Sequence, residues 1–332
     1  MCAKKKHITS NPDLPIIKTG WTQNPMDNAG LYRNLYERSE RDFKDLFKWQ
    51  FGEKPHKAEK KTESFAHTVI SNNPFLSNKN EGIIWLGHAS FLIHCNGLRI
   101  LTDPIFWAMP GLKRLTAMPC LPTELVDIDI ILLSHNHRDH ADERSMKLVC
   151  QQNSKATILT GLQIGNLLRS WGIQNPIQGA GWYQQYHTPG IRISYLPAKH
   201  WNRRFLWDLN TMLWGSFMIE GTKNTIFFGA DSGYDAHFTE LPNLFEKIDI
   251  CILGCGTYKP EWFMSTSHKS PIEAVQAFHD TKAHTFIPMH IGTFDLSDEP
   301  LSEPFRLLKK YEAESAVQGK LRVLDIGETM VL

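Results

Sequence analysis

The chain lacks a charge excess of either sign. Its 332 residues carry 36 Lys and Arg against 35 Asp and Glu, a net charge of +1 with histidine neutral. Proteins dedicated to nucleic acids usually show a strong basic excess, so we expect no nucleic-acid partner. No run of 18 apolar residues occurs either, so we expect no membrane-spanning helix.

Cysteine pairs and an apolar leader are also missing. None of the six cysteines belongs to a C-x-x-C pair, and the opening "MCAKKKHITSNPDLP" is polar and basic. Scattered cysteines without a secretory signal favour free thiols in a reducing compartment. We therefore expect a cytoplasmic protein.

The composition of the sequence changes near residue 80 and divides the chain into two unequal parts. Residues 1–80 are polar and charged, and we expect an N-terminal extension packed on the surface of one domain, 81–332. Within the extension, 36–52 reads as a helix ending at Gly52, and 53–65 reads as a charge-rich, solvated loop.

From residue 82, short apolar runs alternate with turns and helical segments. Strands are predicted within 82–104 (with a turn at Asn96-Gly97), 126–134, 155–160, 190–198, 214–231, 247–255 and 283–290. Helices are predicted over 142–152, 162–172, 271–281 and 301–313. This interleaving of strands and helices defines the α/β class.

The segment "SHNHRDH" (134–140) follows an apolar strand and is unusually rich in metal-ligand side chains. It offers His135, His137, Asp139 and His140. Three later apolar runs also end in such residues, namely His200, Asp231 and His290. Because α/β folds place their chemistry at strand ends, we expect all seven to converge on one sheet edge.

Imidazole and carboxylate ligands suit borderline metals such as zinc, and seven ligands can serve two ions. We assign His135, His137 and His200 to one ion, Asp139, His140 and His290 to the other, and Asp231 as the bridge. Two such ions trap a hydroxide that can attack an anionic phosphodiester, while their charge stabilises the phosphoryl oxygens. Other divalent metals also fit these ligand types.

The motif H-x-H-x-D-H is the signature of the metallo-β-lactamase superfamily. The stretches "WLGHASFLI", "ILTDPIF", "PAKHWNRRFLWDLNTMLWGSFMI", "FFGADSGY", "EWFMSTSHKSPIEAV" and "MHIGTFDLSDEP" resemble, more specifically, the N-acyl-phosphatidylethanolamine-hydrolysing phospholipase D family. The resemblance covers about residues 80–298. It implies a four-layer αβ/βα sandwich, two zinc ions in a cleft between the sheets, and release of phosphatidic acid and an N-acylethanolamine from a membrane lipid.

The resemblance also assigns roles to particular residues. The family's zinc ligands fall on the seven residues above, of which Asp139 and Asp231 also count as catalytic. His268, in "STSHKSP", falls on an active-site histidine near the phosphate, where it binds the phosphate or protonates the leaving alkoxide. Asp103 is expected to orient the ligand loop. His88 is assigned to the same outer shell or to a structural role, and Trp201, Arg203 and Arg204 are assigned to substrate binding, although a solvated arginine is the commoner case.

We therefore expect a zinc-dependent phosphodiesterase of the phospholipase D type that acts at the inner face of a membrane; a homodimer is left open. The alternative is a hydrolase of a sugar lactone or a small soluble phosphodiester on the same fold. A nuclease lacks support from the charge balance, and a di-iron protein of this fold usually carries glutamate where this chain has His137. An inert binding protein would be expected to lack a ligand, and none is missing.

The loop "PIFWAMPGLKRLTAMPCLP" (104–122) is apolar for a connection between strands. We expect Lys113 and Arg114 to meet anionic lipid while apolar side chains enter the headgroup region, namely Phe106, Trp107, Met109, Leu112 and Leu115. The alternative is that this loop packs on the core of its own domain.

Overall fold

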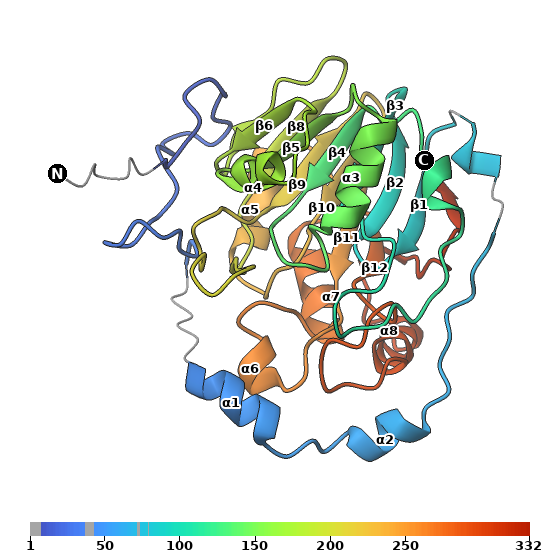
Figure 1. The fold of residues 1–332 in the computed structure, drawn as a ribbon. Coiled ribbons are helices and arrows are strands. Elements are labelled where there is room, and N and C mark those ends of the chain that lie inside the picture. Colours follow the sequence, from blue (N-terminus) through green and yellow to red (C-terminus); the bar gives the residue numbers. More distant parts are fainter. Residues whose placement is uncertain (1–7, 37–42, 72–73, 79) are drawn as a thin grey trace.

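The computed structural model describes residues 8–36, 43–71, 74–78 and 80–332. In these residues, two seven-stranded sheets pack against each other, and helices cover their outer faces (Figure 1). The predicted α/β class and the four-layer αβ/βα sandwich are confirmed.

The first sheet contains the early part of the domain. Its strands, in spatial order, are β14 (Thr329–Val331), β1 (Gly82–Gly87), β2 (Ser90–Cys95), β3 (Leu98–Thr102), β4 (Ile130–Leu133), β5 (Thr157–Gly161) and β6 (Ile177–Ala180). β1, β2 and β3 pair antiparallel, and the pairs from β3 to β6 are parallel. Parallel pairing places the ends of β3 and β4 at one edge.

The second sheet mirrors this plan. Its strands, in spatial order, are β13 (Lys320–Leu321), β12 (Thr285–Met289), β11 (Ile250–Gly254), β10 (Thr225–Phe228), β9 (Ser216–Glu220), β8 (Arg192–Leu196) and β7 (Gln184–Gln185). β10, β11 and β12 run parallel, so their carboxyl ends share an edge.

Two apolar clusters explain why these segments form strands. Alternate residues of β1 and β2, such as Trp85 and Phe91, face the second sheet, where Phe217 and Phe228 meet them. The residues between them, such as Leu92, join the second cluster under the helices. Both faces of the strands are therefore buried, and the sequence shows near-continuous apolar runs instead of alternation.

The helices form the outer layers. They are α1 (Phe43–Phe51), α2 (Lys57–Thr62), α3 (Glu143–Gln152), α4 (Ile164–Ser170), α5 (His237–Leu244), α6 (Glu261–Met264), α7 (Pro271–Asp280) and α8 (Glu303–Ala313), with 3₁₀ turns at Pro74–Leu76 and Pro122–Glu124. Asp142 caps α3 by accepting the Ser145 N–H, and Ser270 and Glu273 form a capping box at α7. Among the described helices, none has the length and apolar character needed to cross a bilayer.

Every strand and helix predicted for the domain is present, with boundaries shifted by a few residues. The prediction for 53–65 is wrong in part, because Lys57–Thr62 forms α2. Part of the helix predicted over 36–52 lies outside the described residues, and α1 occupies Phe43–Phe51. α5, α6 and the short strands β6, β7, β13 and β14 were not predicted, because their sequences carry no sustained apolar period.

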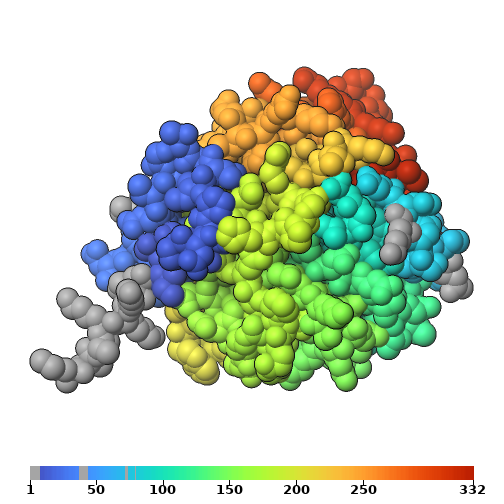
Figure 2. Space-filling view, turned by 90° about the horizontal axis from the view of Figure 1, so that it is seen from above, coloured from blue at the N-terminus to red at the C-terminus, as the bar shows by residue number. Residues whose placement is uncertain are grey.

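The N-terminal segment, blue in Figure 2, lies on the surface of the molecule, and Ile16 pairs with Gln184 of β7 in the second sheet. Gln184 is fully buried, and its amide group bonds backbone atoms of Asn11, Leu14 and Gly181. Leu14 and Tyr32 are buried in the core between the sheets. The Gln184 side chain thus forms hydrogen bonds with backbone groups of the N-terminal segment and fixes it to β7.

We expect Gln184→Leu to reduce the free energy of unfolding by about 2 kcal/mol, because it leaves buried backbone groups unpaired. Thermal unfolding should then shift down by several degrees, and proteolysis should release the segment before Lys18 sooner. The control is Gln151→Leu, an exposed glutamine. Equal midpoints for both variants would contradict this role.

Candidate metal centre

Four strand ends bring the predicted ligands together. β4 leads into His135–His140, β8 into His200, β10 into Asp231 and β12 into His290. The expectation of a single sheet edge is wrong. β4 belongs to the first sheet and the other three strands to the second, so the ligands meet across the gap between the two sheets.

Three imidazoles form the first ligand group. Nε2 of His135 lies 3.0 Å from Nδ1 of His137, and Nε2 of His200 lies 3.1 Å from the same atom. The other nitrogen of His200, Nδ1, donates to the Ser267 carbonyl at 3.0 Å, which fixes the tautomer and leaves Nε2 as a lone pair. Converging lone pairs of this kind suit a shared cation.

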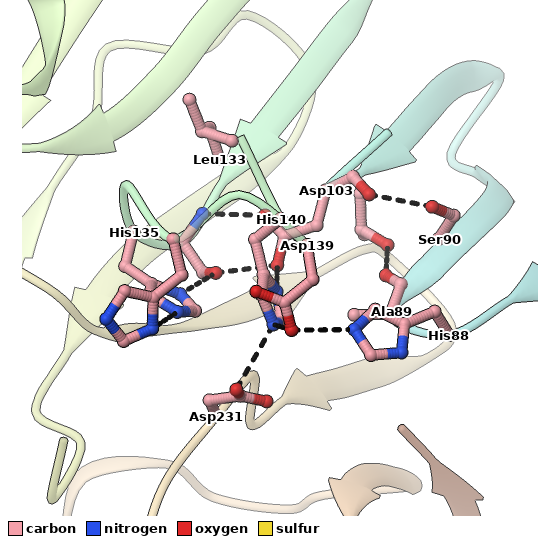
Figure 3. A network of polar contacts seen from close by, with 12 residues as sticks. His88, Ala89, Ser90, Asp103, Leu133, His135, Asp139, His140 and Asp231 are labelled. Carbon is pink, nitrogen blue, oxygen red and sulfur yellow. Dashed lines mark hydrogen bonds and ion pairs between the residues drawn. The ribbon is translucent and has the colours of Figure 1, made fainter. Parts of the chain in front are cut away.

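The second group joins Asp139, His140 and His290, with His88 at its margin. Asp139 Oδ2 lies 3.3 Å from Nε2 of His290 and 3.1 Å from Nε2 of His88. His88 is buried and its Nε2 contacts the Asp139 carboxylate, which is compatible with either of the roles predicted for it, and its role stays a prediction. Figure 3 shows Asp139 between His88 and His140.

Asp231 lies between the two groups. Its Oδ2 is 3.1 Å from Nε2 of His140, 3.2 Å from Nε2 of His290 and 3.9 Å from Nε2 of His200. A carboxylate in contact with imidazoles of both groups is placed as a bridge requires. The role of each ligand stays a prediction, and the geometry is compatible with all seven.

Buried atoms without hydrogen bonds support the fit of a metal. Nε2 of His140 and Nε2 of His290 are buried and have no partner except the carboxylates of the site, and the buried Oδ1 of Asp231 makes no hydrogen bond. Such atoms are costly unless something else satisfies them. Nitrogen and oxygen donors in this number fit borderline divalent cations such as zinc.

The carboxylates and imidazoles perturb one another strongly. Burial lowers the pKa of His135 and of His200 well below the usual value, which keeps both rings neutral. Burial alone would also lower the pKa of His290, but Asp231 and Asp139 outweigh it and raise the pKa to about 9. His140 behaves in the same way for the same reason. The carboxylates, with pKa values held well below normal by these rings, stay ionised despite burial.

Asp103 orients the ligand loop. Oδ1 accepts the Ser134 N–H at 2.8 Å, and Oδ2 accepts the Ser134 hydroxyl at 2.6 Å and the Nδ1–H of His140 at 2.8 Å. His140 therefore lies between Asp103 on one side and Asp231 on the other (Figure 3). These contacts are compatible with the orienting role predicted for Asp103, which stays a prediction.

His268 borders both groups. Its side chain is mostly buried, Nδ1 lies 3.8 Å from Asp231 Oδ2, and the ring centroid is 5.3 Å from that of His200 and 5.5 Å from that of His290. Its catalytic role remains a prediction, and its place beside the bridging carboxylate is compatible with it.

The predicted substrate-binding residues are placed differently from one another. Trp201 contacts the ring of His137, with centroids 4.6 Å apart, and so borders the site. Arg203 Nε donates to the Phe205 carbonyl. Arg204 donates to the carbonyls of Ala141 at 2.7 Å and Asn136 at 3.3 Å, so it stabilises the ligand loop. For Arg204, this geometry favours a positioning role over substrate contact.

Sequence reasoning missed several residues that support the site. The carbonyl of Ser267 and the hydroxyl of Ser134 fix the rings of His200 and His135. Ser134 directly precedes the first ligand, which could have drawn attention to it, whereas a backbone carbonyl leaves no signal in sequence. Arg138, between two ligands, is exposed and lies 5.9 Å from the ring of Phe205.

Comparison with known proteins agrees with this geometry. The profile described as "Beta-lactamase superfamily domain" matches residues 98–291, more than half of the chain. The chain therefore belongs to the beta-lactamase superfamily. This is the superfamily that the H-x-H-x-D-H motif indicates.

Particular relatives share the core of the chain. An uncharacterised protein of Mycobacterium tuberculosis is 34% identical over 245 residues, covering 70% of this chain and 64% of its own length. The mitochondrial N-acyl-phosphatidylethanolamine-hydrolysing phospholipase D of Saccharomyces cerevisiae is 34% identical over 257 residues, covering 74% of this chain and 54% of its own length. The chain thus matches less than two thirds of the length of these relatives.

A solved structure shares the fold. The isothiocyanate hydrolase from Delia radicum gut bacteria superimposes with a TM-score of 0.62 at 18% identity, over 76% of this chain and 98% of that protein. At this identity the likeness concerns the fold alone.

We expect Asp231→Asn to lose at least one metal ion per chain, because a neutral amide bridges two dications poorly. Elemental analysis of gently purified protein measures the content. The matched control is Asp295→Asn, an exposed aspartate. Unchanged metal content in the Asp231 variant would exclude a bridging role.

The metal-free protein should lose stability as pH rises from about 6.5 to about 9. Protonated His290, with its raised pKa, stabilises the fold below the unfolded value of about 6.5, and this contribution disappears as pH passes about 9. Metal affinity should rise over the same range, because ligands bind when deprotonated. Thermal unfolding of chelator-treated protein tests this. His290→Asn should flatten the slope, whereas His284→Asn, at an exposed ring, should keep it.

Proposed function

We propose that this protein is a zinc-dependent phosphodiesterase of the phospholipase D type. Its substrate would be an N-acyl-phosphatidylethanolamine-like lipid, which it would hydrolyse to an N-acylethanolamine and phosphatidic acid. The observation that carries the proposal is the meeting of seven ligand-type side chains, with Asp231 between the two groups. The name of the yeast relative supports the substrate class.

His135, His137 and His200 would hold one zinc ion, Asp139, His140 and His290 the other, and Asp231 would touch both. When bound, two zinc ions would supply a nucleophile from water at neutral pH and neutralise the phosphoryl charge. The protein's own contribution is to keep Asp139 and Asp231 ionised and His135 and His200 neutral in a buried place. Asp103 and the Ser267 carbonyl orient the rings, so little reorganisation is needed during the reaction.

His268 would act on the phosphodiester itself. It lies beside Asp231, and part of its side chain is exposed. From this position, an imidazolium can donate a hydrogen bond to a phosphoryl oxygen or a proton to the departing alkoxide of the N-acylethanolamine.

We expect His268→Ala to keep its metal content and to lower the turnover of phosphodiesters by about 10² or more, the usual scale for a positioned acid–base group. The control is His284→Ala, whose ring is exposed. Turnover equal to that of the wild type would assign His268 a structural role.

A paired assay separates this activity from the rival one on the same fold. Metal-loaded protein is offered a bilayer-embedded N-acyl-phosphatidylethanolamine and a sugar lactone. Faster hydrolysis of the lipid supports the proposal, and faster hydrolysis of the lactone would replace it. Hydrolysis of neither substrate would favour a binding protein.

In the loop 104–122, the prediction of lipid contact is wrong for two residues, Phe106 and Arg114. Phe106 is buried, and the Arg114 guanidinium donates to the carbonyls of Leu86, Ile105 and Thr116. Both side chains are committed to the protein's own interior, so they are unable to meet lipid. Lys113 and Leu115 remain exposed.

We propose instead that the loop between β8 and β9 docks on the bilayer. Leu206 and Trp207 are 79% and 78% exposed, and Trp207 stacks on Phe205 with the planes 4° apart. The loop directly follows His200 and Trp201, and in Figure 1 it lies in the left half of the molecule, with the N-terminal segment farther to the left. Arg138 lies beside it and adds the positive charge that favours anionic lipid.

We expect Leu206→Ser combined with Trp207→Ser to weaken binding to vesicles that contain anionic lipid. Activity on a soluble short-chain phosphodiester should stay unchanged, because neither residue reaches the ligand groups. A matched control is Trp107→Ser with Leu112→Ser in the loop 104–122. If both double variants bind vesicles as the wild type does, the docking assignment is wrong.

A further inference from the structure

Three segments that carry site residues meet behind Asp231. Gly233 packs so closely there that a Cβ atom would lie 2.7 Å from the Ser265 carbonyl oxygen and 3.2 Å from the Lys199 side chain. Lys199 precedes His200, and Ser265 belongs to the turn that leads to His268. The three segments therefore meet closely at one point.

Ser232 connects two of these segments. Its hydroxyl accepts the Lys199 N–H at 2.9 Å and lies 3.1 Å from Nε2 of the buried His237. The Gly233 N–H donates to the Lys199 carbonyl at 2.8 Å. The turn after Asp231 is thereby fixed to the segment that carries His200.

Lys269 connects the third segment. Its side chain is 1% exposed, and its ammonium donates to the Ser232 carbonyl at 2.6 Å and lies 5.1 Å from the ring of Phe238. Burying an ammonium costs several kcal/mol unless its contacts offset that cost. A neutral side chain would fill the same space at less cost, so the position of this charge calls for a function.

We propose that Ser232, Gly233 and Lys269 form a brace that sets the relative positions of Asp231, His200 and His268, with Lys269 as a positioning residue for the metal centre. The inference rests on the proposed metal site but not on the identity of the substrate. Backbone geometry supports it. Ala230, just before Asp231, has a φ of +45°, a conformation that a non-glycine residue holds only when its surroundings enforce it.

The test compares Lys269→Met, which removes the donor, and Ser232→Ala, which removes the hydroxyl contacts. The probe is Co²⁺ alone, measured by competition with a chelator and by its visible absorption spectrum in the protein. Both variants should bind Co²⁺ about 10- to 100-fold more weakly than the wild type, the usual loss when a partner of a metal ligand is removed. The absorption bands of bound Co²⁺ should also shift, because the ligand geometry changes.

Two controls separate positioning from general stability. Lys309→Met makes the same chemical change at an exposed lysine, and Ile93→Val weakens the buried core of the first sheet. Both should keep the wild-type affinity and spectrum. Thermal unfolding of the metal-free proteins shows whether each variant folds; if Lys269→Met does not, Ser232→Ala alone decides.

The outcomes distinguish the two proposals. Wild-type affinity and spectrum in the folded variants would overturn the brace and leave the metal site intact. If the wild type itself bound no Co²⁺, the metal site and the brace would both fail. If it bound Co²⁺ but hydrolysed no phosphodiester, the proposed substrate would be wrong and the brace would still be judged by binding.

Discussion

Two carboxylates closely surrounded by imidazoles are the constraint on which the rest of the structure depends. Asp139 and Asp231 stay ionised in a dry environment because cationic or hydrogen-bonding partners surround them. Without a cation at its centre, this arrangement leaves lone pairs of His135, His137 and His200 facing one another, which costs free energy. The surrounding fold must therefore hold the groups together against their own preference to separate.

The two sheets hold the ligands together because the burial of their apolar side chains stabilises the strands that carry the ligands. The ligands lie within a few residues of the ends of four strands whose side chains are mostly buried, so the backbone that leads to them has little freedom. The backbone is strained in the turns that connect the strands to the site. Four non-glycine residues there have positive φ angles, namely His88, Asp103, Ala230 and His290. Each such conformation costs on the order of 1 kcal/mol, and the rigid sheets offset it. A looser frame would relax these turns and spread the ligands.

Most strands and helices of the domain could be predicted from the sequence, because apolar runs and turn residues are signals that a short stretch of sequence carries by itself. The motif His135–His140 and the strand ends before His200, Asp231 and His290 identified the candidate ligands. The apolar pattern alone could not show which sheet carries each ligand, and only the family resemblance implied a cleft between the sheets. Which strands share a sheet depends on pairing between distant segments, so the ligands from β4 and from β8, β10 and β12 were wrongly expected at one edge. The prediction that Phe106 meets lipid was wrong for a similar reason. An apolar loop can face lipid or pack on its own core, and the sequence is the same in both cases.

The same ligand set serves many reactions, so substrate choice must come from residues at the margin of the site. A dinuclear centre activates water whatever ester it meets, and its ligands carry no information about the leaving group. Exposed features near the ligands can carry it: the stacked Phe205 and Trp207, Arg138 between two ligands, and Trp201 against His137. An apolar surface beside a cation matches an amphiphile whose charge sits at a bilayer, and it offers nothing specific to a small sugar lactone. Under the proposed function, the residues held between the two sheets would carry out the chemistry, and the loop between β8 and β9 would select a lipid.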